Sequence, residues 1–247
     1  MKKEKLCEAQ EFRKIRPRRL LVAVCVALLV LMAACAGESG GVKLSNVISE
    51  AEESSYQISI GAEKLPLRAL SRDFRREAGE TIRRQYAEFP PWSDRFPGSW
   101  YKTFDSWADA CDYIGLELTE PLPGAGETKL WTDGDSKGRI RFLSLSQDDF
   151  SGSVSRQNSV LIYTRNQNGE LTTGFAAREE LRFGEETRAA ASGREALILR
   201  SSPNEMGYRS IAAYLVDGAA LYILHLNCQE PDLPQAEAEL EAWLQRM

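Results

Sequence analysis

The feature that most limits how this chain can fold is an uncharged apolar run of 17 residues, Leu20 to Ala36. It directly follows a basic stretch that ends in Arg18 and Arg19. A positive flank before an apolar run of this length is typical of an export signal, and the basic flank stays in the cytoplasm. As a helix the run would be about 26 Å long, slightly short of a hydrocarbon core of about 30 Å. The pattern predicts either a signal peptide or a short uncleaved anchor.

The apolar run ends with small residues before a cysteine. Ala33, Ala34 and Cys35 resemble the lipobox of bacterial lipoproteins. The resemblance implies that residues 1–35 are a lipoprotein signal peptide, that Cys35 is the lipid attachment site, and that residues 36–44 form a flexible tether. In the alternative, the 20–36 helix is an uncleaved signal anchor that itself contacts membrane lipid. Both alternatives place the remaining chain on the outer face of the cytoplasmic membrane.

The charge of the chain is divided unevenly. Residues 1–19 hold eight Lys/Arg against three Glu, which leaves a net charge of +5. The rest holds 23 Lys/Arg against 33 Asp/Glu, a net charge of −10. Because phosphate binding needs a positive field, the acidic body argues against nucleic acid as the main partner.

Hydrophobic periodicity divides the body into a lead-in, residues 45–101, and a domain, residues 102–247. The lead-in combines a helix with a Pro- and aromatic-rich segment. About seven strands linked by hairpins, with helices before and after them, predict an α+β fold with a mostly antiparallel sheet and helices on one face. The predicted helices cover 71–88, 106–114 and 233–247. The predicted hairpin turns are Asn168-Gly169, Ser192-Gly193 and Asp217-Gly218.

The helix predicted over 71–88 carries five arginines interleaved with acidic residues. A basic face could contact anionic lipid headgroups. However, Glu80 lies four residues from both Arg76 and Arg84, a spacing that pairs opposite charges on a helix. This interleaving favours an ordinary solvated face.

The order of motifs from residue 103 onward resembles a domain of unknown function in Gram-positive lipoproteins and anti-sigma-factor-like membrane proteins. The matching residues are Ser106 to Ala110, Ile114 to Leu116, Pro121 to Pro123 and Tyr214 to Tyr222. These motifs are structural rather than catalytic. The resemblance therefore implies a folded sensor-like or binding module outside the membrane and assigns no ligand or active site.

Few residues suggest catalysis or metal binding. His225 is the only histidine, so a usual two- or three-His zinc site cannot form. The segment from Asp133 to Gly138 hints at a calcium loop, but Lys137 stands at a ligand position, and a hairpin turn is the better interpretation. We therefore expect no catalytic, cofactor-binding or metal-binding residues and no cofactor.

Beyond Cys35, the body holds two cysteines, Cys111 and Cys228. In an oxidising compartment they could form a disulfide that joins the second helix to the end of a late strand. The alternative is two buried thiols that act as small hydrophobic side chains.

These observations predict a membrane-anchored extracytoplasmic lipoprotein that is not an enzyme and that binds or senses something in the cell envelope. Its expected partners are membrane lipid and an unknown envelope protein or small ligand. One alternative is a single-span anti-sigma-like signalling protein, in which residues 1–19 contact a cytoplasmic regulator. A third hypothesis, an envelope hydrolase, would need distant carboxylates to converge in one cleft with raised pKa values.

Overall fold

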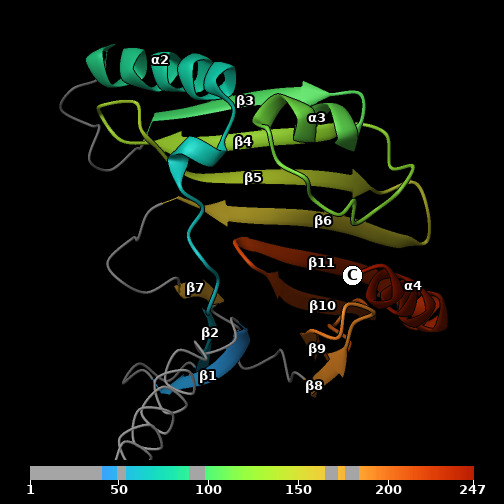
Figure 1. Ribbon diagram of the computed structural model, residues 1–247. Coiled ribbons are helices and arrows are strands. Elements are labelled where there is room, and N and C mark those ends of the chain that lie inside the picture. Colours follow the sequence, from blue (N-terminus) through green and yellow to red (C-terminus); the bar gives the residue numbers. More distant parts are fainter. Residues whose placement is uncertain (1–40, 49–53, 89–97, 165–171, 176–183) are drawn as a thin grey trace, which may run out of the picture. The chain divides into compact units, whose positions relative to one another are not determined.

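In the described part of the chain, an eight-stranded antiparallel sheet forms the centre of the body, in the order β3-β4-β5-β6-β11-β10-β9-β8 (Figure 1). Its strands are β3 (Gly98–Phe104), β4 (Thr128–Gly134), β5 (Ile140–Asp149), β6 (Val154–Tyr163), β8 (Gly184–Ala189), β9 (Glu195–Arg200), β10 (Tyr208–Asp217) and β11 (Ala220–Gln229). A smaller sheet has the order β1-β2-β7, with β1 (Val42–Ile48), β2 (Ser54–Ile60) and β7 (Thr172–Phe175). The computed structural model describes residues 41–48, 54–88, 98–164, 172–175 and 184–247.

Three α-helices cover one face of the large sheet (Figure 1). They are α2 (Arg72–Glu88), α3 (Trp107–Ile114) and α4 (Leu233–Arg246), and 3-10 turns precede α2 (Leu67–Ala69) and α4 (Glu230–Asp232). Phe74, Ile114 and Leu240 from these helices pack in one core with alternate residues of the strands. This arrangement agrees with the predicted α+β class, with eight strands in the main sheet rather than about seven.

The opposite face of the sheet has a second, smaller core. Leu197, Leu199 and Tyr214 from β9 and β10 pack there against Ile60, the last residue of β2. The backbone of Glu63 donates a hydrogen bond to the carbonyl of Gly218 in the β10–β11 turn (2.9 Å). The segment after β2 is thereby held against the large sheet.

Local sequence signals fix the ends of α3. The Ser106 hydroxyl accepts a hydrogen bond from the Asp109 backbone at the N-terminus, and Gly115 ends the helix with a φ of 77°. Both features confirm the prediction for 106–114. The helices predicted at 71–88 and 233–247 are confirmed as well, but the Asp232 side chain makes no capping hydrogen bond to α4. A 3-10 turn leads into α4 instead.

α2 makes an unusually close contact with the β4–β5 turn. A Cβ placed on Gly79 would lie 2.6 Å from the carbonyl oxygen of Gly138, so only glycine fits there without movement of backbone. Further along the helix, the Gln85 side chain accepts a hydrogen bond from the Ser99 backbone of β3 (2.8 Å). The glycine that interrupts the helical pattern is therefore a packing requirement.

β5 contains an irregularity that decides which of its apolar residues enter the core. The register with β4 shifts between Asp133 and Gly134. Asp133 pairs with Phe142 and Gly134 pairs with Ile140, so Arg141 has no paired residue on β4. Ile140, Leu143 and Leu145 belong to the helix-side core. Phe142 does not; it contacts Trp131 and Tyr163, so β5 carries apolar residues on both faces of the sheet.

The hairpins at Ser192-Gly193 and Asp217-Gly218 are confirmed by the β8–β9 and β10–β11 pairings. Asn168-Gly169 lies outside the described residues. Strands over 42–48, 54–60, 98–104 and 128–134 were not predicted. The first begins within the expected tether, the second lies within the lead-in, and the third crosses the end of the lead-in at residue 101.

None of the helices in the described ranges is long and apolar enough to cross a membrane. The apolar run at 20–36 lies outside those ranges.

Candidate functional site

The predicted lipid attachment site, Cys35, lies outside the described residues. Cys111 and Cys228 are described, and both are buried free thiols rather than a disulfide. Burial raises the pKa of the Cys111 thiol to about 11, so this thiol stays protonated at neutral pH. The Cys228 pKa is raised for the same reason.

The geometry of β11 explains why the two thiols do not pair. Cys111 shares a hollow with Thr119, whose backbone donates a hydrogen bond to the hydroxyl of Tyr222 near the start of β11 (3.1 Å). Cys228 lies six residues further along the same strand, a separation of about 20 Å at about 3.3 Å per residue. A disulfide requires Cα atoms within about 7 Å of each other.

The segment from Asp133 to Gly138 forms the β4–β5 turn and not a calcium loop. The Asp135 carboxylate accepts hydrogen bonds from the backbone of Lys137 (3.0 Å) and Arg139 (3.1 Å) and pairs with the Arg139 guanidinium. Within the described ranges no group of three or more His, Cys, Asp or Glu side chains could hold a metal ion.

His225 lies on β11 and faces away from the helices. Its ring meets Tyr214 edge to face, with 6.1 Å between ring centroids. Burial lowers the pKa of His225 below its ordinary value. This environment is that of a packed histidine in a sheet.

The lowered pKa of His225 leads us to expect a specific pH dependence of the protein's stability. The folded protein resists protonation of His225, whereas the unfolded chain takes up the proton near pH 6.5. The free energy of unfolding should therefore fall as the pH falls from neutral through that range. Denaturant unfolding of the wild type and of His225→Gln between pH 7 and pH 5 checks this, because the carboxylates titrate in both proteins. Equal slopes in the two would contradict it.

Polar side chains replace apolar ones along one row on the helix side of the sheet. Thr128, Gln147 and Asn158 lie on the neighbouring strands β4, β5 and β6, with Gln147 and Asn158 directly paired in the register. All three are buried, and Thr128 and Asn158 are fully inaccessible. The Gln147 amide donates to Thr128 (3.3 Å) and to Glu120 (3.2 Å). Polar residues at inward positions of a sheet need such partners.

A cavity of about 70 Å³ lies between this row and α4. β6 and β11 provide Asn158 and Leu224 to its wall, α4 provides Glu239 and Trp243, and the loop before β4 provides Leu122. A hydrogen bond from the Arg246 guanidinium to the Pro121 carbonyl (2.5 Å) ties that loop to α4. The cavity is thus bounded by sheet, helix and loop together.

Several buried polar atoms in the wall of this cavity make no hydrogen bond to any group that the structure describes. They are Asn158 Oδ1, Asn158 Nδ2, Trp243 Nε1, Arg156 Nε and Glu239 Oε2. The last two form an ion pair with each other at 3.4 Å, which leaves the Asn158 amide and the Trp243 indole nitrogen. Both amide atoms of Asn158 are in this set, so the result does not depend on which way the amide is turned. A buried polar atom without a partner costs about 1–3 kcal/mol, which makes a cluster of them unusual in a structural core. The Asn158 amide is therefore a buried polar group beside the cavity whose hydrogen bonds the described residues do not supply.

The charges beside the cavity are paired with one another. The Arg156 guanidinium contacts Asp149, and its Nε lies 3.4 Å from Glu239 Oε2. Hydrogen bonds from Ser151, together with Arg156, lower the pKa of Asp149 to about 2. Among the described carboxylates whose pKa is shifted, only that of Asp133 is raised; burial is the cause, and Asp133 pairs with Arg141 (3.3 Å). The convergent pair of carboxylates with raised pKa values expected of a hydrolase is not found in the described part of the chain.

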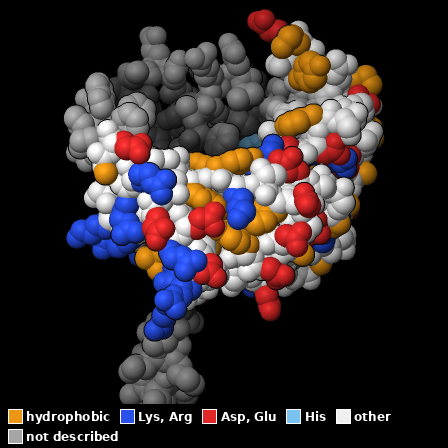
Figure 2. Space-filling view, turned by 90° about the horizontal axis from the view of Figure 1, so that it is seen from above, with side chains coloured by type: hydrophobic (Ala, Val, Ile, Leu, Met, Phe, Trp, Pro, Cys, Tyr) orange, Lys and Arg blue, Asp and Glu red, His pale blue; other side chains and the backbone are white. Residues whose placement is uncertain are grey.

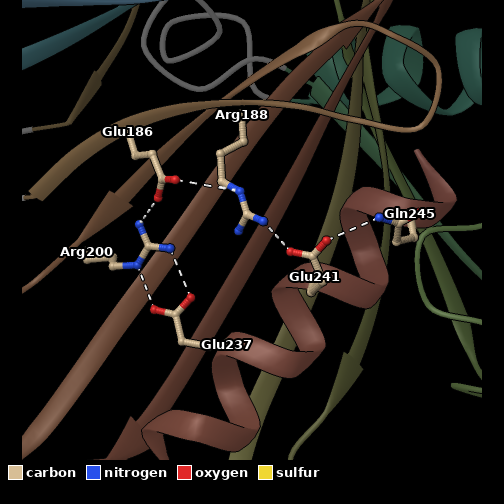
Figure 3. A network of polar contacts seen from close by, with 6 residues as sticks. All are labelled: Glu186, Arg188, Arg200, Glu237, Glu241 and Gln245. Atoms are coloured by element: carbon tan, nitrogen blue, oxygen red, sulfur yellow. Dashed lines mark hydrogen bonds and ion pairs between the residues drawn. The ribbon is translucent and has the colours of Figure 1, made fainter.

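On its other side, α4 is held by a network of ion pairs with β8 and β9 (Figure 3). Arg200 binds Glu237 through two hydrogen bonds of 2.7 and 2.9 Å and also contacts Glu186 (2.7 Å). Arg188 bridges Glu186 and Glu241. The bond from Arg200 lowers the pKa of Glu237, so this carboxylate is charged at neutral pH. α4 is therefore fixed over the cavity by charged contacts from β6, β8 and β9.

The sheet face opposite the helices carries a row of aromatic rings. Ring centroids are 5.4 Å apart for Trp131 and Phe142 and 5.0 Å apart for Phe142 and Tyr163. Trp131 is 39% exposed, and its neighbour on β3, Tyr101, is 56% exposed. Unlike the residues of the cavity, these two rings are open to solvent.

Charged side chains of both signs are interspersed over the described surface seen from above, with Lys and Arg gathered toward one side (Figure 2). On α2, Arg76 pairs with Asp73 (3.0 Å), and both side chains are exposed. This agrees with the expected solvated face of that helix.

The sequence interpretation missed the cavity, although a signal for it was present. Gln147 continues the inward alternation of Leu143 and Leu145, and Asn158 precedes the inward residues Val160 and Ile162 by the same spacing. Of these two polar residues at core positions, Asn158 lines the cavity, whereas Gln147 is hydrogen-bonded to Thr128 and Glu120 beside it.

In comparisons with known proteins, the chain matches no protein-family model, no curated protein and no solved structure. The resemblance to the envelope domain therefore stays a prediction.

Proposed function

We propose that the protein is a membrane-anchored extracytoplasmic lipoprotein that acts as a non-catalytic binding or sensing module of the cell envelope. Lipid on Cys35 tethers the body to the outer face of the cytoplasmic membrane. A small ligand or an envelope protein is its partner outside.

The observation that carries the binding role is the fully buried Asn158 amide, unpartnered among the described residues, at the wall of the cavity under α4. A structural core gains by replacing such a group with an apolar side chain, whereas a binding site uses it. The tether is supported by the apolar run and by Ala33-Ala34-Cys35 at its end.

The test of the tether is the mass and lipid content of the membrane-bound protein, with wild type compared with Cys35→Ala. We expect the wild type to begin at an acylated Cys35, and Cys35→Ala to remain uncleaved and unacylated. Cys25→Ala is the matched control, because Cys25 lies within the same apolar run; it should be processed as the wild type is.

A full-length, unacylated chain in all three proteins would overturn the lipoprotein proposal. That result would favour the second candidate, a single-span signalling protein, which is supported by the eight Lys/Arg residues that precede the apolar run. Pull-down with a peptide of residues 1–19 would then test for a cytoplasmic regulator.

A further inference from the structure

We propose that the sheet face opposite the helices binds a neutral glycan, whose sugar rings stack on Tyr101 and Trp131. The inference goes beyond the proposed function, because this face is a second surface that shares no residue with the cavity under α4. Three properties of the face carry it: two open aromatic rings, charges that are paired with one another, and a small apolar area.

The two rings are neighbours at one end of the sheet. Tyr101 of β3 pairs directly with Trp131 of β4, so both side chains project from the same face. Among the ring contacts of the described residues, none joins Tyr101 to Trp131. β2 covers the β9–β10 half of this face, where Tyr214 is buried, but Tyr101 and Trp131 are exposed. Stacking on each other therefore does not account for the two rings, whereas a ligand that covers both does.

Every charged side chain of β4 and β5 is held in an ion pair. The pairs are Lys129–Asp148 (3.0 Å), Arg141–Asp133 (3.3 Å) and Arg156–Asp149. A charged ligand would have to compete with one of these pairs for its partner, whereas a neutral ligand leaves all of them intact. The charges of the face therefore favour a neutral molecule.

A sugar ring matches this combination of aromatic rings and short polar side chains. One side of a pyranose carries C–H groups with a small positive charge, and the face of an aromatic ring carries a small negative one, so the two attract each other when stacked. The hydroxyls at the rim of the sugar need hydrogen-bonding partners. Thr103, Ser144 and Ser146 provide hydroxyls beside the rings, since Ser144 pairs with Trp131 and Thr103 and Ser146 both pair with Lys129.

The apolar area of the face limits the size of its partner. A tyrosine or tryptophan side chain has about 150–250 Å² of surface, so exposed fractions of 56% and 39% leave about 200 Å² open in total. A stable protein interface needs about 800 Å² from each partner, with an apolar core. Two rings among short polar side chains make a small core for a second copy of the chain, but they are enough for two sugar rings, one stacked on each.

The test is an NMR titration of the full-length protein, isotopically labelled at the tryptophan indoles, in a phosphocholine detergent that carries no sugar. The probes are two neutral glycans, cellotetraose and chitotetraose, and tetraglucuronate with the linkage of cellotetraose, which adds a carboxylate to each ring. The indole signal of Trp131, identified by its absence from Trp131→Phe, should shift and saturate with a neutral glycan. The signal of Trp243, which is buried on the helix side of the sheet, should not move. Tetraglucuronate should bind more weakly than cellotetraose by about tenfold or more, because its carboxylates find no free cation on β4 or β5.

Tyr101→Ala and Trp131→Ala each remove one of the two stacking surfaces. Each should weaken binding of the neutral glycan by about tenfold or more, since each ring supplies about half of the open apolar area. Phe150→Ala is the matched control. Phe150 is 61% exposed on the β5–β6 turn, six residues after Ser144 and thus about 20 Å beyond the two rings, so binding should be unchanged. Saturation-transfer NMR of the glycan measures affinity in all three variants, and their unfolding temperatures distinguish loss of the site from loss of the fold.

A Trp131 signal that does not move with either neutral glycan would overturn the proposal as a whole. Equal affinity for tetraglucuronate and cellotetraose would overturn the neutral ligand class, and equal weakening by Phe150→Ala and Trp131→Ala would overturn the site. A Trp131 signal that moves with protein concentration alone would identify a second copy of the chain as the occupant and overturn the glycan. None of these results alters the processing of Cys35, so failure of this inference is distinguishable from failure of the proposed tether.

Discussion

Trp243→Ala is expected to lower the free energy of unfolding by about 3–5 kcal/mol, the range for truncating a buried tryptophan. Trp243 is only 2% exposed and is among the largest fully buried side chains in the described part of the chain. It packs with Ala236, Leu240 and Leu244 on the buried face of α4. Its indole N–H makes no hydrogen bond to a described group, so the loss should come from packing alone. Guanidinium unfolding followed by far-UV circular dichroism measures it.

Trp131→Ala is the matched control for this experiment. Trp131 is on the opposite face of the sheet and is 39% exposed, so its truncation should cost much less. Trp243→Phe, which keeps an aromatic ring, should fall between Trp243→Ala and the wild type. A loss below about 1 kcal/mol for Trp243→Ala would contradict the packing of α4 against the sheet.

Gly79→Ala is expected to destabilise the protein by about 1–2 kcal/mol, although alanine is the better helix former. Propensity alone would add about 1 kcal/mol of stability to α2. The new Cβ, however, would lie 2.6 Å from the Gly138 carbonyl oxygen, and backbone cannot easily move away. Overpacking of this kind costs about 1–3 kcal/mol, and a contact this short falls at the upper end of that range. Denaturant unfolding decides which effect is larger.

Glu80→Ala provides the control at the adjacent, exposed position of the same helix. This change alters helix propensity without a close contact and should stay within about 0.5 kcal/mol of the wild type. If Gly79→Ala were instead more stable than the wild type, the close contact between α2 and the β4–β5 turn would be wrong.

Much of the fold could be predicted because its signals are local. Ser106 and Gly115 define the ends of α3, and Asp217-Gly218 joins two strongly apolar strands. The strand at 54–60 escaped prediction because it is rich in Ser, and the strand at 42–48 because Ser45 and Asn46 interrupt its alternation of apolar and polar residues. β3 escaped because it begins in a segment dominated by Pro and aromatic residues, which suggested a loop.

The site could be predicted only in part, because its partners are distant in the sequence. Alternation along β5 and β6 would place Gln147 and Asn158 in the core. No local pattern shows that Trp243 and Glu239, about 80 residues after Asn158, line the same cavity as Asn158. The separation of Cys111 and Cys228 also depends on three-dimensional structure, since it follows from the part of β11 that lies near α3.

Among the described residues the large sheet does not close on itself, so its two outer strands matter for association with other chains. An exposed strand edge is a template on which a further strand can add. At one edge, the Ser99 backbone N–H of β3 is already bonded to the Gln85 side chain. At the other edge, β8 is only six residues long and carries Glu186 and Arg188, both held in the ion-pair network. The same contacts that secure α2 and α4 thus protect the edges of the sheet against aggregation.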